Sequence, residues 1–265
     1  MKELIEFNSS GSRLHGVFYP GGGETPRQTA LLVRGFPPEE GDSIFGQRLA
    51  VGGINAMIFW HRGTGQSEGT FSLKHAQEDI HAALDFLGTG SVIEKYKIDT
   101  DRLLLGGISF GGGMALSYAA AHPSVRRVFT LAGDDHGEVK RHHQRDPAYA
   151  EGMDAYLASL NYPDGPIHFE NDRLMDEIIQ DPTPYDLRLN AAALADRDIL
   201  LIGGWDDAVV TFEDKILPVY RALKAAGADS VKITAVQDDH SFEHSINELA
   251  EIIITWIKKG QQTKK

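Results

Sequence analysis

The chain has 265 residues, 42% of them hydrophobic and 24% charged, a composition typical of one large globular domain. Its net charge of −12 repels phosphate backbones, so the charge balance argues against a nucleic-acid groove. The lack of cysteine excludes disulfides, thiolate metal sites and cysteine nucleophiles.

Residues 1–8 carry acidic and polar side chains where a signal peptide has a continuous apolar core. No apolar run along the chain approaches the roughly 20 residues that span a bilayer. We therefore expect a cytoplasmic protein without a membrane partner.

Predicted strands and predicted helices then alternate along the chain. Residues 4–7 and 14–19 alternate apolar and polar side chains around a turn at 8–12, which indicates an antiparallel hairpin. Short apolar runs between turn residues predict further strands at 29–33, 56–60, 103–105, 128–131, 199–202 and 231–236. Apolar spacing and position predict helices at about 45–51, 73–87, 113–121, 213–226 and from 245 onwards. Ser245 and Glu248 would open the last helix as a capping box.

This alternation predicts an α/β fold, in which a mostly parallel, twisted sheet of about eight strands has helices on both faces and the hairpin at one edge. In such sheets the chemistry lies beyond the carboxyl ends of the strands.

Residues 134–196 interrupt the pattern with dense charge, scattered aromatic side chains and two proline breaks. Connections of this length are usually functional. We interpret the segment as a helical cap inserted into a core made of residues 1–133 and 197–265. Its larger apolar side chains either bury the cap against the core or line a pocket: Tyr149, Met153, Tyr156, Leu157, Leu160, Tyr162, Phe169, Leu174, Met175, Ile178 and Ile179.

The stretch Gly107-Ile108-Ser109-Phe110-Gly111 is a G-x-S-x-G pattern between a buried strand and a helix, the setting in which it presents a nucleophile. A serine on such a tight turn has a strained backbone, so only glycine fits two positions to either side. The helix that follows offers free N–H groups and a partial positive charge. We interpret Ser109 as a nucleophile.

A serine hydroxyl needs a base within hydrogen-bond reach, and that base needs an acid to orient it. Asp206 and Asp207 follow the second-to-last predicted strand, and His240 follows the last one. These loops should meet Ser109 at one sheet edge, in the chain order serine, aspartate, histidine. His240 is the preferred base because His244 lies at the start of the last helix and would face sideways.

Four stretches carry a resemblance to a known family: residues 101–112 around the serine, 204–210 around the aspartates, 239–242 around the histidine, and the loop 62–69. Over essentially its whole length the chain resembles the α/β-hydrolase superfamily. The resemblance is closest to small carboxylesterases of the feruloyl-esterase type and to the catalytic domains of prolyl-oligopeptidase-like peptidases.

The resemblance implies that Ser109 is the nucleophile, Asp207 the acid and His240 the base. Acids in this family usually lie three residues after a glycine and just before a small residue and a pair of valines. Asp207 has this position after Gly204, whereas Asp206 would place the valines one residue off.

The tetrahedral intermediate needs two N–H donors for its oxyanion. The N–H of Phe110 is one candidate. In the family the second comes from a loop that begins His-Gly, and here that loop reads Arg34-Gly35-Phe36, which makes Phe36 the candidate donor. Arginine in place of histidine puts the usual side-chain support of the loop in doubt. Arg34 would pair with an acid such as Asp42 or meet an anionic group of the substrate.

Signals for a metal or a cofactor are weak. Asp134, Asp135 and His136 could ligate a cation, although a polar loop that leaves a strand and enters the cap is the commoner explanation for such a stretch. The glycine-rich stretches 21–23 and 106–113 lack the features of a dinucleotide fingerprint and of a P-loop. We expect neither a cofactor nor a metal.

The sequence thus predicts a serine hydrolase that cleaves a carboxylic ester of a small molecule through an acyl-enzyme on Ser109, with Trp205 near the substrate. Two alternatives remain open. One is an amide or peptide hydrolase of the prolyl-oligopeptidase type. The other is a binding protein that has kept the fold without catalysis.

Overall fold

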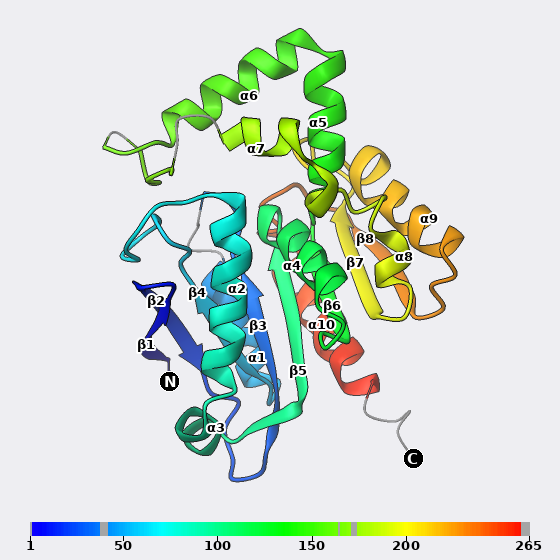
Figure 1. The fold of residues 1–265 in the computed structure, drawn as a ribbon. Helices are drawn as coiled ribbons and strands as arrows, with labels where there is room; N and C mark the ends of the chain where they lie inside the picture. The colour runs from blue at the N-terminus through cyan, green and yellow to red at the C-terminus, as the bar shows by residue number, and fades with distance from the viewer. Residues whose placement is uncertain (1, 38–41, 164, 171–173, 261–265) are drawn as a thin grey trace.

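The computed structural model describes residues 2–37, 42–163, 165–170 and 174–260 (Figure 1). Within these ranges the chain forms an eight-stranded sheet, made of β1 (Glu3–Ser9), β2 (Ser12–Tyr19), β3 (Arg27–Val33), β4 (Asn55–Phe59), β5 (Ile98–Ile108), β6 (Arg127–Leu131), β7 (Asp198–Gly204) and β8 (Val231–Val236). The order across the sheet is β1-β2-β4-β3-β5-β6-β7-β8. β2 pairs antiparallel with β1 and with β4, and the other pairs are parallel. The predicted hairpin and mostly parallel sheet are confirmed.

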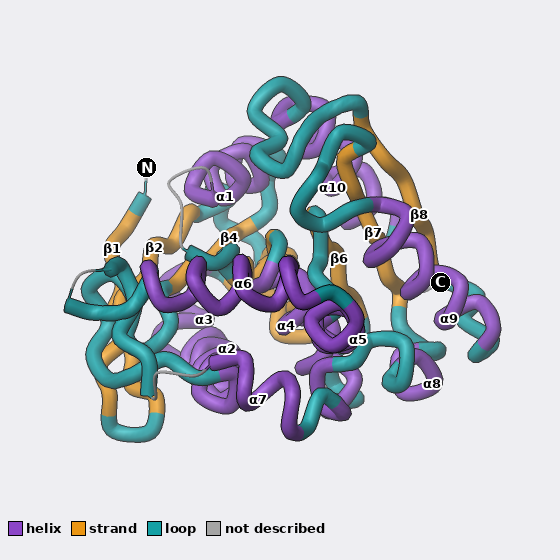
Figure 2. The backbone as a smooth tube through the Cα atoms, turned by 90° about the horizontal axis from the view of Figure 1, so that it is seen from above, coloured by secondary structure: helices purple, strands orange, loops and turns teal. Residues whose placement is uncertain are grey.

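The helices of the described ranges are α1 (Asp42–Val51), α2 (Leu73–Leu87), α3 (Gly90–Tyr96), α4 (Phe110–Ala121), α5 (His136–Arg145), α6 (Pro147–Ser159), α7 (Leu174–Gln180), α8 (Ala191–Leu194), α9 (Leu217–Ala225) and α10 (Ile246–Lys259). A 3₁₀ turn (Thr183–Tyr185) precedes α8, and a π-helical turn (Phe212–Ile216) leads into α9. Seen from above, α1 and α10 cover one face of the sheet, and α2 and α4 cover the other (Figure 2). None of the helices in the described ranges combines the length and the apolar character that crossing a bilayer requires.

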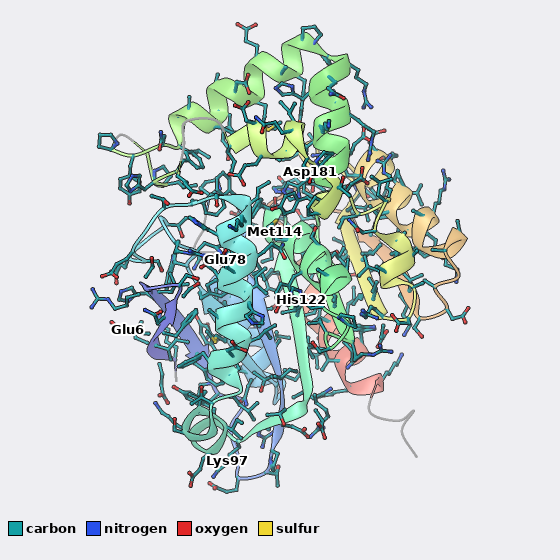
Figure 3. The ribbon with its side chains drawn as sticks, in the orientation of Figure 1. Glu6, Glu78, Lys97, Met114, His122 and Asp181 are labelled. Atoms are coloured by element: carbon teal, nitrogen blue, oxygen red, sulfur yellow. The ribbon has the colours of Figure 1, made fainter. Side chains whose placement is uncertain are left out.

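Helices α2 and α4, beside the central strands, are joined by a hydrogen bond as well as by packing. Met114 of α4 is fully buried, and its carbonyl accepts a hydrogen bond of 3.1 Å from Gln77 of α2 (Figure 3). Ten of the twelve residues of α4 are buried. The glycines and alanines of this helix suit close contact with a sheet, because they leave little side chain between the two backbones.

Strand β5 is longer than the sequence predicts, since it begins at Ile98 rather than at Leu103. The extra residues include charged side chains, so a search for apolar runs does not find this part of the strand. Arg102 donates to Asp99 over 2.5 Å, so these charges satisfy one another at the sheet end. The short helix α3 ahead of the strand is likewise absent from the prediction.

The predicted capping box at the start of α10 is wrong. Ser245 occupies the N-cap position, but its side chain makes no capping hydrogen bond. The carboxylate of Asp238 instead accepts from the N–H groups of His244 and Ser245, at 3.0 and 2.7 Å. An acceptor from the preceding loop has therefore replaced the local one.

The chain between β6 and β7 forms α5, α6, α7 and α8. In Figure 1, α5, α6 and α7 lie above the edge at which the parallel strands end. None of the residues of α6 is buried. Two isolated bridges, Thr64 with Ile167 and Phe71 with Phe169, tie this segment to the loop after β4.

Candidate active site

Ser109 lies on the turn between β5 and α4 in a left-handed backbone conformation, with φ 53° and ψ −124°. Its N–H donates to the carbonyl of Leu131 on β6, at 2.8 Å. A Cβ on Gly107 would overlap the backbone of Gly111, and one on Gly111 would overlap the backbone carbonyl of Val33. Both positions therefore require glycine, and the turn is fixed by backbone contacts on either side of the serine.

A chain of hydrogen bonds joins three side chains from different strand ends. His240 Nε2 lies 3.0 Å from Ser109 Oγ, and His240 Nδ1 lies 2.7 Å from Asp207 Oδ2. Asp207 is buried, and its other oxygen accepts from the N–H groups of Val209 and Val210, both at 2.8 Å. These two bonds hold the carboxylate so that Oδ2 faces the imidazole, which favours the tautomer with its proton on Nδ1.

The competing acid and base are placed elsewhere. Asp206 is exposed and accepts a hydrogen bond of 2.6 Å from Gln237. His244 is exposed, and its backbone N–H is held by Asp238. Within the described part of the chain neither makes a hydrogen bond with Ser109, whereas Asp207 and His240 form the chain described above.

The loop after β3 passes directly beside the serine. A Cβ on Gly35 would meet the Cβ of Ser109 at 3.7 Å. Among the described residues, no acceptor is found for the N–H of Phe36 or for the N–H of Phe110. Two backbone donors thus remain available on the loops that flank the nucleophile.

Packed aromatic rings support this loop. The ring of Phe36 lies 4.9 Å from that of Phe71, 5.3 Å from that of Phe110 and 6.0 Å from that of Phe169, measured between centroids. Sequence reasoning missed Phe71, which belongs to no periodic element. Its flanking Gly69 and Thr70, which mark a loop, gave no sign that its side chain would be fully buried.

A cavity of about 1020 Å³ lies between these loops and helices α5 to α7. Ser109 and His240 line it together with Phe36 and Phe110. The side chains that line it from residues 134–196 are mostly apolar: Val139, Tyr149, Met153, Tyr156, Leu157, Leu174, Met175 and Ile178. Seven of these are among the apolar residues for which the sequence left open whether they face a pocket.

The predicted substrate contacts Arg34 and Trp205 do not line this cavity. Arg34 is buried, with its guanidinium 4.8 Å from the centroid of the Trp60 ring. The side chain of Asp42, its expected partner, lies outside the described residues. Trp205 is 52% exposed and packs on Phe212, with the ring centroids 4.7 Å apart.

Comparison with known proteins places the chain in a family. The sequence pattern of the prolyl oligopeptidase family matches residues 62–263, which is most of the chain. The chain belongs to the prolyl oligopeptidase family. The prediction of a serine hydrolase of the α/β-hydrolase superfamily is thereby confirmed. No curated protein matches the chain by sequence.

Solved structures share the fold at low sequence identity. An esterase domain from Rhodothermus marinus is 19% identical, with 98% of each chain covered and a TM-score of 0.66. The α/β-hydrolase GrgF from Penicillium sp. is 16% identical, with 98% of each chain covered and a TM-score of 0.72. An esterase from Pyrococcus furiosus is 16% identical over 98% of this chain and 92% of its own, with a TM-score of 0.68. At such identities the likeness shows a common fold.

In this member of the prolyl oligopeptidase family, the cavity also contains charged and polar groups beside the triad-like chain. Lys215 Nζ lies 2.9 Å from Asp134 Oδ1. Burial works against both charges, but the ion pair raises the pKa of Lys215 and holds the pKa of Asp134 below its ordinary value. Burial lowers the pKa of His136 and raises the pKa of Tyr149, so these two are neutral at neutral pH. Sequence reasoning missed Lys215, because a single lysine in a helical pattern gives no sign of burial.

Asp135 belongs to a structural cluster at the start of α5. One oxygen accepts from the N–H groups of Gly137 and Leu187, and the other lies 3.1 Å from Arg141 and 3.0 Å from Arg188. In the part of the chain that the structure describes, no three His, Cys, Asp or Glu side chains come together as metal ligands. The Asp134 to His136 stretch therefore anchors α5 and one wall of the cavity.

The loop 62–69, which resembles a loop of the family, is anchored to α2. Asp79 is fully buried and accepts from Ser9 Oγ, from the Arg62 N–H and from Arg62 Nε, at 2.7, 2.9 and 2.7 Å. Burial pushes the pKa of Asp79 upward, but the neighbouring His61 and Arg62 outweigh it and hold the pKa below its ordinary value. The buried ion pair between Asp79 and Arg62 thus fixes the base of the loop.

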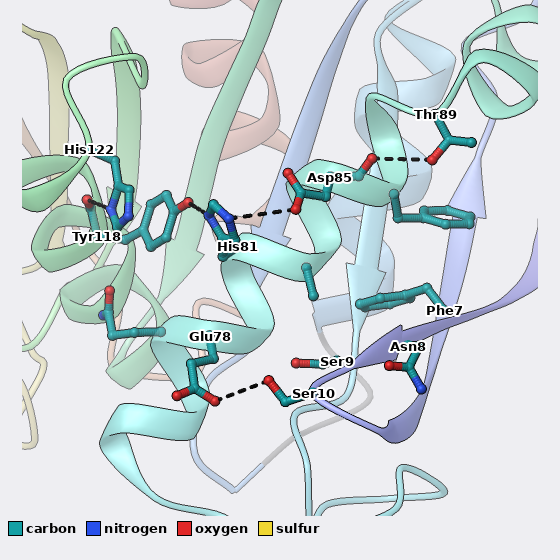
Figure 4. A pocket seen from close by; sticks show the side chains of 13 residues that line it. Phe7, Asn8, Ser9, Ser10, Glu78, His81, Asp85, Thr89, Tyr118 and His122 are labelled. Carbon is teal, nitrogen blue, oxygen red and sulfur yellow. Dashed lines mark hydrogen bonds and ion pairs between the residues drawn. The ribbon is translucent and has the colours of Figure 1, made fainter.

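A second cavity of about 700 Å³ lies between the β1–β2 turn, helix α2 and the end of α4 (Figure 4). His81 Nδ1 lies 2.7 Å from Tyr118 Oη, and the ring of Tyr118 stacks on that of His122, with centroids 3.8 Å apart. Tyr118 and His122 stand at the opposite end of α4 from Ser109. This cavity is therefore separate from the candidate active site.

Proposed function

We propose that the protein hydrolyses carboxylic esters through an acyl-enzyme on Ser109. The observation that supports this best is the hydrogen-bond chain from Asp207 through His240 to Ser109 at the wall of a largely apolar cavity. A serine oriented by an imidazole and a buried carboxylate is the arrangement that activates a hydroxyl for attack on a carbonyl.

In the proposed reaction, Ser109 Oγ attacks the ester carbonyl carbon while His240 Nε2 accepts the hydroxyl proton. The N–H groups of Phe36 and Phe110 stabilise the negative oxygen that forms. The imidazolium then gives its proton to the leaving alcohol oxygen as the carbon–oxygen bond breaks. A water molecule, deprotonated by His240, then attacks the acyl-enzyme carbon. As the bond to Ser109 Oγ breaks, His240 returns this proton to Ser109 and the acid is released. Asp207 stabilises the imidazolium throughout.

The proposal assigns residues 134–196 the role of a cap on a core of residues 1–133 and 197–265. The cap side chains that line the cavity would contact the acyl or alcohol chain and so select the substrate.

An ester is favoured over a peptide by the chemistry of the cavity wall. A bound peptide needs partners for its own N–H and C=O groups, because burying them unpaired is costly. Most of the side chains that line this cavity are apolar and offer no such partners. Peptide hydrolysis, which the name of the family suggests, is the second candidate.

A fluorophosphonate probe tests the nucleophile, and mass mapping should locate the label on Ser109. The Ser109→Ala variant should lose the label and lose hydrolysis of p-nitrophenyl esters by at least about 10³-fold. A label on another residue, or one that persists in the variant, would refute the assignment.

Substrate class is tested with matched esters and amides of the same acyl groups. We expect turnover of the esters and little turnover of the anilides and peptides. Faster hydrolysis of peptides would put the second candidate first. The absence of both labelling and turnover would favour a binding protein without catalysis.

A further inference from the structure

Besides Ser109 and His240, the polar side chains that line the apolar cavity include Asp134, His136, Tyr149 and Lys215, here called the Tyr149–Lys215 group. Tyr156, Ser241 and Glu243 line it as well. Lys215 and His136 are 6% and 3% exposed, so these polar atoms are withdrawn from solvent. Buried polar groups normally have partners, and those that lack them call for an explanation.

Two members of this group lack a partner within the described residues. The hydroxyl of Tyr149 and Nδ1 of His136 are buried without any hydrogen bond. Lys215 makes an ion pair with Asp134 but carries three N–H donors, of which this contact uses one. Tyr149 and Lys215 line the same cavity, so both can donate to one molecule that binds there. Besides Asp134, the described residues supply no acceptor for these donors.

The charge of the group restricts the acceptor. Lys215 and Asp134 neutralise each other, and His136 and Tyr149 are neutral. A carboxylate would place a second negative charge beside Asp134 and would have to be fully desolvated, which is costly. An uncharged carbonyl or hydroxyl oxygen accepts from the same donors without that cost.

The group lies close to the nucleophile. The backbone N–H of Asp134 donates to the carbonyl of Ser109 at 3.1 Å. The ring of His136 stands edge-on to that of Phe110, with centroids 5.2 Å apart. The side of the group formed by Asp134 and His136 therefore adjoins the turn that carries Ser109.

We propose that the Tyr149–Lys215 group binds an uncharged oxygen, a ketone or hydroxyl, carried by the substrate a few bonds from its ester group. This inference rests on the proposed function and narrows its substrate class to oxygen-substituted aliphatic esters. Tyr149 and Lys215 then determine substrate specificity. The hydroxyl of Tyr149 is the donor that distinguishes an oxygen-substituted ester from a plain one.

The test compares p-nitrophenyl heptanoate with its analogues that carry a ketone at successive positions, and heptyl acetate with the corresponding keto-alcohol acetates. For the analogue with its ketone at one of these positions, we expect kcat/KM to exceed that of the unsubstituted ester by about tenfold or more. Tyr149→Phe should lower this ratio by about tenfold. Tyr220→Phe, on α9 away from the cavity, should leave the ratio unchanged.

Thermal stability separates recognition from a structural role. The Tyr149 hydroxyl has no partner within the described residues, so Tyr149→Phe should leave Tm unchanged or raise it. A fall in Tm with an unchanged ketone ratio would show a structural hydroxyl and overturn the inference. Equal rates for the parent ester and every ketone analogue would overturn it as well.

Binding to the Ser109→Ala variant separates the failure of this inference from that of the proposed function. If that variant binds the ketone ester about tenfold more tightly than its parent while the wild type turns neither over, the proposed chemistry fails and the subsite stands. If the wild type hydrolyses esters but neither series shows a preference in Kd or kcat/KM, the subsite is refuted and the esterase stands.

Discussion

The helix below Ser109 and the helix above the cavity are built in opposite ways. Helix α4 buries ten of its twelve residues, whereas α6, all of which is described, buries none of its thirteen. A Cβ on Gly111 in α4 would overlap the backbone of β3, whereas a Cβ on Gly152 in α6 would meet nothing within 4 Å. The nucleophile thus stands on a densely packed element, and the opposite wall of the cavity belongs to a loosely packed one.

This difference separates two requirements of catalysis. The reacting groups must be held within a fraction of an ångström, which dense packing provides. The groups that contact the rest of the substrate need only a suitable shape and polarity, and a helix with few buried contacts accepts substitution at little cost. Substitutions in the region around α4 should therefore have severe effects, and substitutions in α6 should have mild ones.

The largest effect is expected for Asp207→Asn, which tests the hydrogen-bond chain of the densely packed region. The amide would offer an N–H where the imidazole needs an acceptor, which favours the wrong tautomer of His240. We expect kcat on a p-nitrophenyl ester to fall by roughly 10⁴-fold, the size known for loss of such an acid.

The matched control is Asp206→Asn, because Asp206 is the exposed neighbour that binds Gln237. Its kcat should stay within about threefold of the wild type, as expected for a surface side chain. A greater loss with Asp206→Asn than with Asp207→Asn would reverse the assignment of the acid.

The next largest effect is on stability, at the buried pair below the loop 62–69. Asp79→Asn removes the buried charge partner of Arg62 and leaves only the partly exposed Glu78, which should lower the free energy of unfolding by about 3–5 kcal/mol. Folding depresses the pKa of Asp79, so its contribution is complete above the ordinary value near 3.8 and is lost as the pH falls further. The difference in free energy of unfolding between variant and wild type, measured by urea unfolding, should stay constant from pH 8 to 5 and shrink below about pH 4.

Glu78→Gln is the control for this pair. Glu78 binds the same guanidinium at 2.7 Å, but its side chain is 36% exposed, so the change should cost less than about 1 kcal/mol. A gap for Asp79→Asn that already closes between pH 7 and 5 would contradict the lowered pKa of Asp79.

Much of the densely packed region could be predicted from the sequence because its constraints are local. The glycines around Ser109, and the strand ends before Asp207 and His240, lie within a few residues of the groups that they position. The aromatic support of Phe36 could not be predicted, since Phe71 and Phe169 come from loops almost 100 residues apart. Lys215 was missed for a similar reason, because its partner Asp134 lies on a different strand end.

The same reasoning explains the wrong capping box at α10. Ser245 and Glu248 have the spacing of a local cap, but Asp238 from the loop before the helix already accepts from the Ser245 N–H that Glu248 would satisfy. Local patterns thus predict correctly where no tertiary acceptor competes for the same donors.

Gly111→Ala should have the third largest effect, about 3 kcal/mol of lost stability. The new methyl group would overlap the carbonyls of Val33 and Arg34, which are backbone atoms and cannot rotate away. Because β3 also leads into the Phe36 loop, the displacement should lower kcat as well. Urea unfolding and ester turnover check both effects, and a variant as stable as the wild type would show that the turn is not tightly packed.

Gly152→Ala in α6 should have the smallest effect, and one of opposite sign. The position is helical and open, so alanine should raise stability by about 0.5–1 kcal/mol through its better helix propensity. If unfolding of α6 is uncoupled from that of the core, the gain will appear in hydrogen exchange of α6 while the global unfolding curve stays the same. A loss of global stability comparable with that of Gly111→Ala would mean that the two regions are equally constrained, and the contrast between them would fail.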